Sequence, residues 1–187
     1  MKSLVAYGTR YGSTSKIAAF IATILREEHI EVEVVELTNK ERPSFDLTEY
    51  DLIIVGSAIR MGKWTNEALD FIKRNERIIA TKKAAFFVSC ASAREPDKRS
   101  KARIDYLEKV IDRYPLISPI ALGLFGGYFD FTGNHGFFYR ITINSFKRQL
   151  DREGVDTSKP YDFRDWEAIE DWTRSVAAYV QVHSVTT

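Results

Sequence analysis

The most constraining feature of the sequence is a strand–loop–helix pattern in its first 25 residues. Residues 4–7 (LVAY) form a short apolar run, which is typical of a strand buried on both faces. Residues 8–15 (GTRYGSTS) then supply two glycines and a series of Ser and Thr hydroxyls, and an apolar helical face begins at Ile17. The first N–H groups of a helix lack intrahelical partners, and the helix dipole favours an anion there. The pattern therefore predicts a phosphate-binding loop.

The composition of this loop limits the kind of phosphate. It lacks the lysine of a nucleoside-triphosphate site and the glycine spacing of a dinucleotide site, although Glu36 at the end of the next strand leaves a weak dinucleotide signal. Neutral hydroxyls and amides suit a single terminal phosphate. Arg10 either assists binding or points to solvent. The simpler alternative is an ordinary junction in which Ser and Thr cap the helix.

Composition excludes several classes of function. The 187 residues are 44% hydrophobic and 28% charged, as in globular proteins, and the net charge of +1 argues against nucleic-acid binding. One cysteine, Cys90, excludes an intrachain disulfide, and the three histidines show no metal-ligand spacing. No signal sequence and no apolar run of about 20 residues appears. We expect a cytoplasmic or peripheral membrane protein without a metal.

Apolar strands alternate with helices along the chain. Further strands are predicted at residues 30–37, 51–56, 82–89 and 117–125, and helices follow from about Thr65, over 104–111 and over 166–182. The alternation predicts an α/β fold with a doubly wound parallel sheet in the order 2-1-3-4-5 and helices on both faces. Residues 1–187 should form a single domain. The loops after the first, third and fourth strands should meet at one edge of the sheet.

Two of these loops are suited to a flat ligand. Residues 57–64 (SAIRMGKW) and 89–93 (SCASA) are rich in small side chains, which allow close approach of the backbone. Trp64, Met61 or Ile59 is expected to pack on a ring face. A phosphate loop beside a slot between two loops suits FMN. The alternatives are that Trp64 only anchors the next helix, and that Cys90 is a small residue at a strand end.

Three motifs resemble a known family. Residues 9–14 (TRYGST), the loop 57–62 (SAIRMG) and the five-strand pattern resemble the flavodoxin superfamily over almost the whole chain. Together with residues 154–167 (GVDTSKPYDFRDWE), they resemble more narrowly the menaquinone-dependent protoporphyrinogen oxidases, which are FMN enzymes with an insertion in or just after the fifth strand. The corresponding insertion here is about 128–160, and it opens with an irregular aromatic stretch at Tyr128.

The resemblance implies that FMN binds at the three loops. By this resemblance, the residues that bind the phosphate are Thr9, Arg10, Tyr11, Gly12, Ser13 and Thr14. The same resemblance carries isoalloxazine contacts to Ser57, Ala58, Ile59, Arg60, Met61, Gly62 and Lys63, and to Ser89, Cys90, Ala91, Ser92 and Ala93. Flavodoxin electron carriers usually have an aromatic in the second ring loop and are strongly acidic. This chain has neither feature, which favours an enzyme with an accessible ring face.

Two basic segments leave alternatives open. Residues 136–152 (GFFYRITINSFKRQLDR) form a basic amphipathic stripe, which suits an anionic membrane surface, a homodimer or another partner, or else packs on its own domain. Residues 94–103 hold five basic side chains that either meet the propionates of a porphyrin or simply begin a solvated helix.

The sequence therefore favours an FMN-dependent oxidoreductase. By resemblance, it passes electrons from protoporphyrinogen IX, an intermediate of heme biosynthesis, to a quinone. No acid or base is assigned to the protein. The alternatives are a flavodoxin-type electron carrier that serves a redox partner protein, and an interaction module with no cofactor.

Overall fold

The computed structural model describes residues 1–38, 46–131, 144, 147–148, 150–184. Its centre is a parallel sheet of five strands: β1 (Lys2–Gly8), β2 (Glu31–Glu36), β3 (Leu52–Ala58), β4 (Lys83–Ser89) and β5 (Pro119–Phe125). The strand order is β2-β1-β3-β4-β5, and every neighbouring pair is parallel, so the predicted topology is confirmed.

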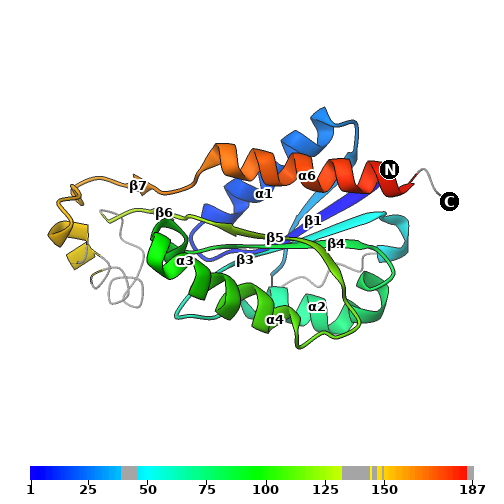
Figure 1. The fold of residues 1–187 in the computed structure, drawn as a ribbon, viewed down its shortest axis with the longest axis horizontal. Coiled ribbons are helices and arrows are strands. Elements are labelled where there is room, and N and C mark those ends of the chain that lie inside the picture. The colour runs from blue at the N-terminus through cyan, green and yellow to red at the C-terminus, as the bar shows by residue number, and fades with distance from the viewer. Residues whose placement is uncertain (39–45, 132–143, 145–146, 149, 185–187) are drawn as a thin grey trace.

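Helices cover both faces of this sheet (Figure 1). The helices α1 (Ser13–Glu27) and α6 (Trp166–Ser184) lie on one face, where Val5, Ile54 and Phe87 meet Ile17 and Ile169 in one apolar core. The other face carries α2 (Asn66–Ile79), then α3 (Pro96–Arg103), a π-helical turn η3 (Ile104–Glu108) and α4 (Lys109–Ile111). Strands buried from both sides explain why β1, β3 and β4 read as nearly continuous apolar runs.

The edge strand β2 differs, as its alternating sequence predicts. Val32 is buried, whereas Glu31, Glu33 and Glu36 are exposed. A short 3-10 helix, η1 (Leu47–Glu49), precedes β3 and is capped by Asp46, whose carboxylate accepts a hydrogen bond from the Thr48 N–H at 3.0 Å. A second 3-10 turn, η2 (Ala91–Arg94), follows β4.

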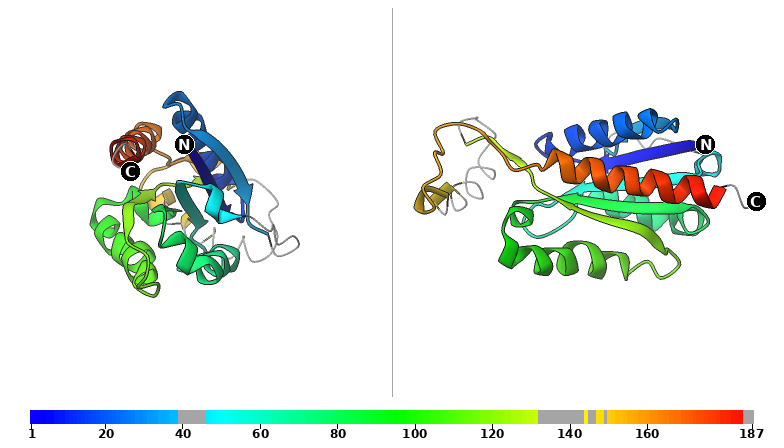
Figure 2. Two further views of the ribbon diagram at one scale, coloured as in Figure 1. Left: turned by 90° about the vertical axis from the view of Figure 1, so that its right-hand side faces the viewer. Right: turned by 45° about the horizontal axis from the view of Figure 1, so that its top comes forward.

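The chain leaves the sheet after β5 and returns before α6. Tyr128–Phe129 form β6, which pairs antiparallel with β7 (Tyr161–Asp162). The prediction of an irregular stretch from Tyr128 is therefore wrong for Tyr128 and Phe129, because these two residues pair with a segment more than 30 positions later. Residues 132–143 of that stretch lie outside the described residues. The ribbon of β6 and β7 extends beyond the carboxyl ends of the strands (Figure 2).

The apolar periodicity of the helices predicted at 104–111 and 166–182 places Ile104 and Tyr179 on their inward faces, but both residues are solvent-exposed. Ile104 is 44% exposed because the π-helical turn changes the register between α3 and α4, and Tyr179 is 41% exposed on α6. Of the other predicted inward residues of α6, Ile169 and Val176 are buried and Trp172 is half-buried against the same core. Asp165 caps the helix by accepting the Ala168 N–H.

Most of the basic stripe at 136–152 lies outside the described residues, including Phe137, Phe138 and Phe146. Of its described members, Leu150 is fully buried and Arg148 and Arg152 are exposed.

Candidate functional site

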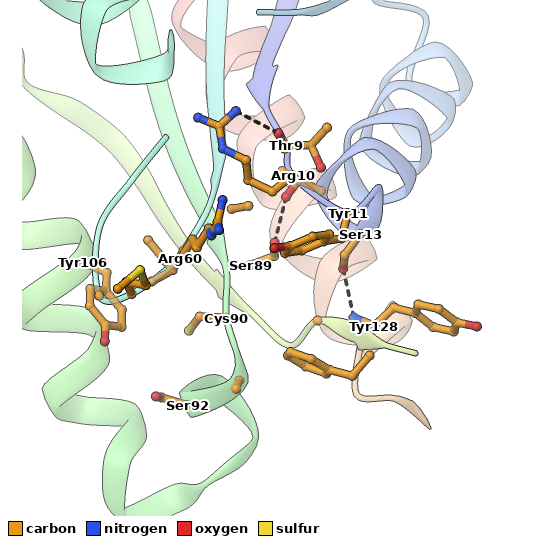
Figure 3. Close-up of a pocket in the computed structure, with 18 residues that line it drawn as sticks. Thr9, Arg10, Tyr11, Ser13, Arg60, Ser89, Cys90, Ser92, Tyr106 and Tyr128 are labelled. Carbon is orange, nitrogen blue, oxygen red and sulfur yellow. Dashed lines mark hydrogen bonds between the residues drawn. The ribbon is translucent and has the colours of Figure 1, made fainter. Parts of the chain in front are cut away.

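A cavity of about 310 Å³ lies at the carboxyl ends of β1, β3 and β4 (Figure 3). Because the strand order reverses between β1 and β3, this edge is where open parallel sheets hold ligands. Its walls are Thr9, Arg10, Tyr11, Ser13, Thr14, Ala58, Ile59, Arg60, Met61, Gly62, Ser89, Cys90, Ala91, Ser92, Tyr106, Gly127, Tyr128 and Phe129.

The loop between β1 and α1 has the properties of an anion site. Gly12, the residue before α1, has φ +81° and, being a glycine, offers the first turn of the helix no side-chain cap. The Thr9 hydroxyl accepts the Gly12 N–H at 3.2 Å, and the Ser13 hydroxyl accepts the Tyr128 N–H at 3.0 Å. Each hydroxyl therefore keeps its own hydrogen to donate to a ligand.

A buried pair of hydroxyls joins two of the loops. Thr14 Oγ1 lies 2.9 Å from Ser89 Oγ, and the two residues are 0% and 5% exposed. The N–H of Ile59 donates to the Ser89 carbonyl oxygen at 3.0 Å, which ties the end of β4 to the loop after β3. These bonds fix the relative positions of the three loops.

Arg10 pairs with Glu67 in α2, an arrangement that neither sequence alternative included. Its two terminal nitrogens donate to the two carboxylate oxygens of Glu67 at 3.0 and 2.7 Å. Burial raises the pKa of the Glu67 carboxyl, but the hydrogen bonds from Arg10 and the backbone outweigh this effect and leave the pKa below its ordinary value. The pair fixes the loop to the start of α2.

The loop after β3 forms a tight hairpin turn. Arg60 and Lys63 exchange two backbone hydrogen bonds of 2.9 and 3.0 Å, and the residues between them, Met61 and Gly62, both have positive φ. Such a turn projects its tip, and the Met61 side chain is 76% exposed at the cavity edge.

Four of the predicted contact residues do not line the cavity: Gly12, Ser57, Lys63 and Ala93. Gly12 shapes the loop through its backbone. Ser57 is fully buried, and its hydroxyl accepts the Thr65 N–H at 2.9 Å. Lys63 is exposed and Ala93 is buried in the core below the site.

The expectation that Trp64 packs on a ligand ring is wrong. Trp64 is 4% exposed, packs in the core below the sheet and donates its indole N–H to the Tyr106 carbonyl oxygen at 2.5 Å. The alternative, that Trp64 anchors the next helix, agrees with its place in the same apolar core as Ala68 and Phe71 of α2, and its hydrogen bond also holds the segment around Tyr106.

Cys90 lies in the cavity wall with a protonated thiol. Burial raises its pKa to about 11, so the thiolate that a nucleophile requires is not formed at neutral pH. This agrees with the interpretation of Cys90 as a small residue at a strand end.

Sequence reasoning missed Tyr106, Gly127, Tyr128 and Phe129. The last three follow β5, whose carboxyl end lies on the same edge as those of β3 and β4, so strand order alone gave a signal for them. Tyr106 sits in a helical segment and gave none.

Side chains of the basic segment 94–103 are engaged within the protein. Arg94 pairs with Glu153 at 2.6 Å, and Arg99 donates to the carbonyl oxygens of Ala93 and Leu124. Lys101 pairs with Asp105. These bonds favour the solvated helix start over a site for propionates.

Two features are absent from the described residues. In this part of the chain, no group of three or more His, Cys, Asp or Glu side chains is placed to hold a metal ion. None of the helices within it has the length and apolarity that crossing a membrane requires.

The fold and cavity define a class: open parallel α/β proteins with an anion-binding loop after the first strand and a ligand cavity at the switch point. Comparison with known proteins gives the family. The model described as Flavodoxin domain matches residues 4–155, and the chain belongs to this family.

The individual relatives share only a modest fraction of their sequence with this chain. A curated protein of Escherichia coli (strain K12), named protoporphyrinogen IX dehydrogenase (quinone), is 26% identical over 177 residues, which cover 95% of each chain. Oxidised flavodoxin 1 from Bacillus cereus has a TM-score of 0.55 at 22% identity and covers 97% of this chain and 98% of its own. A flavoprotein in complex with FMN from Lactobacillus acidophilus has a TM-score of 0.51 at 17% identity, over 66% of this chain and 92% of its own. The two structures show the fold alone.

Proposed function

We propose that the cavity binds FMN and that the chain is an FMN-dependent oxidoreductase, with protoporphyrinogen IX as electron donor and a quinone as acceptor. The flavodoxin domain match supports the cofactor. The name of the Escherichia coli relative supports the donor and acceptor. The proposal depends most on one observation, the cavity that joins the anion-binding loop before α1 to the slot between the other two loops.

The donors on the cavity wall fit one terminal phosphate. The loop before α1 provides these donors: the uncapped N–H groups at the start of α1 and the hydroxyls of Thr9 and Ser13. The charged residues among the described lining residues are Arg60 and Arg10, of which Arg10 is already paired with Glu67, and these lining residues include no carboxylate. Because these residues offer hydrogen-bond donors and no negative charge, the cavity wall favours the binding of an anion.

The opposite end of the cavity fits a flat ring. Ala58, Gly62, Ala91 and Ser92 are small and allow the backbone of both loops to approach a ring. Hydrogen bonds between the loops hold the slot in place. When bound, the flavin supplies the hydride and electron chemistry, and the protein supplies orientation and exclusion of water.

The electron balance requires two partners. Oxidation of protoporphyrinogen IX to protoporphyrin IX removes six electrons and six protons. Three turnovers, each passing two electrons and two protons to a quinone, therefore form three quinols for each porphyrin. The described lining residues include no carboxylate or imidazole to act as a base. We therefore assign no proton-transferring side chain.

The cofactor is tested by the visible spectrum of the purified protein and by titration with FMN. Thr14→Val removes the hydroxyl that faces Ser89 and should weaken FMN binding about tenfold. Thr23→Val is the matched control, since its hydroxyl bonds Ala19 on the same helix but away from the cavity. A colourless protein whose melting temperature FMN does not raise would contradict the proposal.

The reaction is tested separately, by anaerobic assay of the FMN-loaded protein with protoporphyrinogen IX and a menaquinone analogue. Formation of one porphyrin for every three quinols would support the proposed enzymatic reaction. FMN binding without turnover, together with electron exchange with a redox protein, would instead support an electron carrier.

A further inference from the structure

Among the aromatic side chains that line the cavity from outside the three loops, Tyr106 comes from a helical element. Tyr106, in the π-helical turn η3, lines the cavity together with Gly62, Ala91 and Ser92. The loop 89–93 contains no aromatic residue. Tyr106 therefore brings to this end of the cavity a flat ring that the loop lacks.

The π-helical turn explains how a helical residue reaches the cavity. Leu107 and Val110 keep the helix packed in the core, whereas the wider turn at 104–108 changes the register of the side chains around them. The carbonyl oxygen of Tyr106 accepts the indole N–H of buried Trp64 at 2.5 Å, which holds the turn against the loop after β3. Single π turns inside helices recur at functional sites.

Tyr106 lies at the end of the cavity opposite the anion-binding loop. In Figure 3 it stands across the cavity from Ser13 and Tyr128. Its hydroxyl is 4.0 Å from the position that a Cβ on Gly62 would take, at the tip of the hairpin turn. A ligand whose phosphate is bound before α1 would therefore extend its ring toward Tyr106.

Other aromatic rings in the described wall have different neighbours. Arg60 lies over the ring of Tyr11 at 5.9 Å. Lys16 and Arg164 lie over the ring of Tyr128 at 5.6 and 5.4 Å. Tyr106 is half-buried, and burial raises the pKa of its phenol, so the hydroxyl is neutral at physiological pH and suited to a nonpolar slot.

We propose that Tyr106 is a ring-contact residue, whose side chain packs against the isoalloxazine of FMN and orients it between the loops 58–62 and 89–92. This inference rests on the proposed FMN site and extends it to a residue outside the three loops. Aromatic pairs of this kind contribute beyond the area that they bury.

The test compares Tyr106→Leu, Tyr106→Phe and the wild type in binding both FMN and riboflavin, which lacks the phosphate. Tyr106→Leu should raise the Kd for both ligands about tenfold, because the lost contact is with the ring. It should also leave the bound flavin more fluorescent, since a tyrosine in contact quenches flavin emission. Tyr106→Phe should restore affinity.

Tyr179→Leu is the matched control, because Tyr179 is exposed on α6 and absent from the cavity wall; it should change neither Kd nor fluorescence. Melting temperatures of the apoproteins check folding. If the wild type binds FMN but Tyr106→Leu binds and quenches it equally well, or if Tyr106→Phe loses as much affinity as Tyr106→Leu, the ring contact is wrong. If the wild type binds no FMN, the proposed function fails instead.

Discussion

At the scale of single residues, the pair of Arg10 and Glu67 decides how the loop before α1 is held. Glu67 has only 6% of its side chain exposed, and its charge is balanced by two hydrogen bonds from Arg10. A buried carboxylate is stable only with such a partner. The pair therefore stabilises the loop and holds the guanidinium at the edge of the cavity.

Replacing Arg10 by glutamine should lower the free energy of unfolding at pH 7 by about 1–3 kcal/mol, since Glu67 stays buried without its cation. In the wild type the pKa of Glu67 is below the ordinary 4.5, so its contribution is present above that pH and is lost as the pH falls through the lower, folded value. The difference in unfolding free energy between variant and wild type should narrow as the pH falls below 4.5.

Urea unfolding at pH 7, 5 and 3.5 measures this narrowing. Lys2→Gln, which breaks the exposed pair with Glu49, is the control and should have a much smaller effect at pH 7. A difference that stays constant over this range would show that Arg10 acts by packing alone.

At the scale of elements, the start of α1 depends on its backbone geometry. Gly12 adopts a left-handed conformation that side chains disfavour, and α1 begins directly after it. A Cβ at Gly12 would meet no atom closer than 3.9 Å, so conformation, not space, requires a glycine here.

Gly12→Ala should cost about 1 kcal/mol of stability through backbone strain and should also weaken FMN binding, because the loop N–H groups shift. Gly154→Ala is a matched control: Gly154 has φ +74° and nothing within 4 Å of its Cβ position, and it does not line the cavity. It should cost similar stability and leave the Kd for FMN unchanged. If both variants bind FMN with the same Kd, the left-handed conformation of Gly12 is not needed for FMN binding.

At the scale of the whole molecule, the two apolar cores on either side of the sheet hold the strand ends together. The last helix completes one of them: Ile169, Val176, Ala177 and Val180 pack beside α1 and the sheet. Arg174 adds ion pairs to Glu27 and Glu28, which connect α6 to the end of α1, and a further pair to Glu170 within α6. The cavity is therefore built on a sheet that residues far along the chain keep covered.

Ile169→Ala should lower the free energy of unfolding by about 3 kcal/mol, since a fully buried side chain leaves a void between α6 and the sheet. Val182→Ala, at a 67% exposed position of the same helix, should change it by less than about 0.5 kcal/mol. Thermal and urea unfolding measure both. Equal effects would mean that α6 is not a cooperative part of the core.

Local patterns were enough to predict the sheet and most of the cavity wall. Apolar runs mark β1, β3, β4 and β5, and the right-handed crossover connections between parallel strands restrict the strand order. The loops at residues 9–14, 58–62 and 89–92 therefore had to meet at one edge of the sheet. Whether these residues contact FMN stays a prediction. The periodicity predicted the buried faces of the helices less accurately, since Ile104 and Tyr179 are exposed.

The sequence by itself determined the strand order and the edge that carries the cavity, because both follow from periodicity and chain chirality, which are local properties. Only the tertiary structure decided that Arg10 pairs with Glu67, that Trp64 is buried below the site, that Tyr128 joins a ribbon with Asp162, and that Tyr106 enters the cavity. Each of these depends on contacts between segments far apart in the chain, and the free energy of such contacts is set by packing and burial once the elements have met.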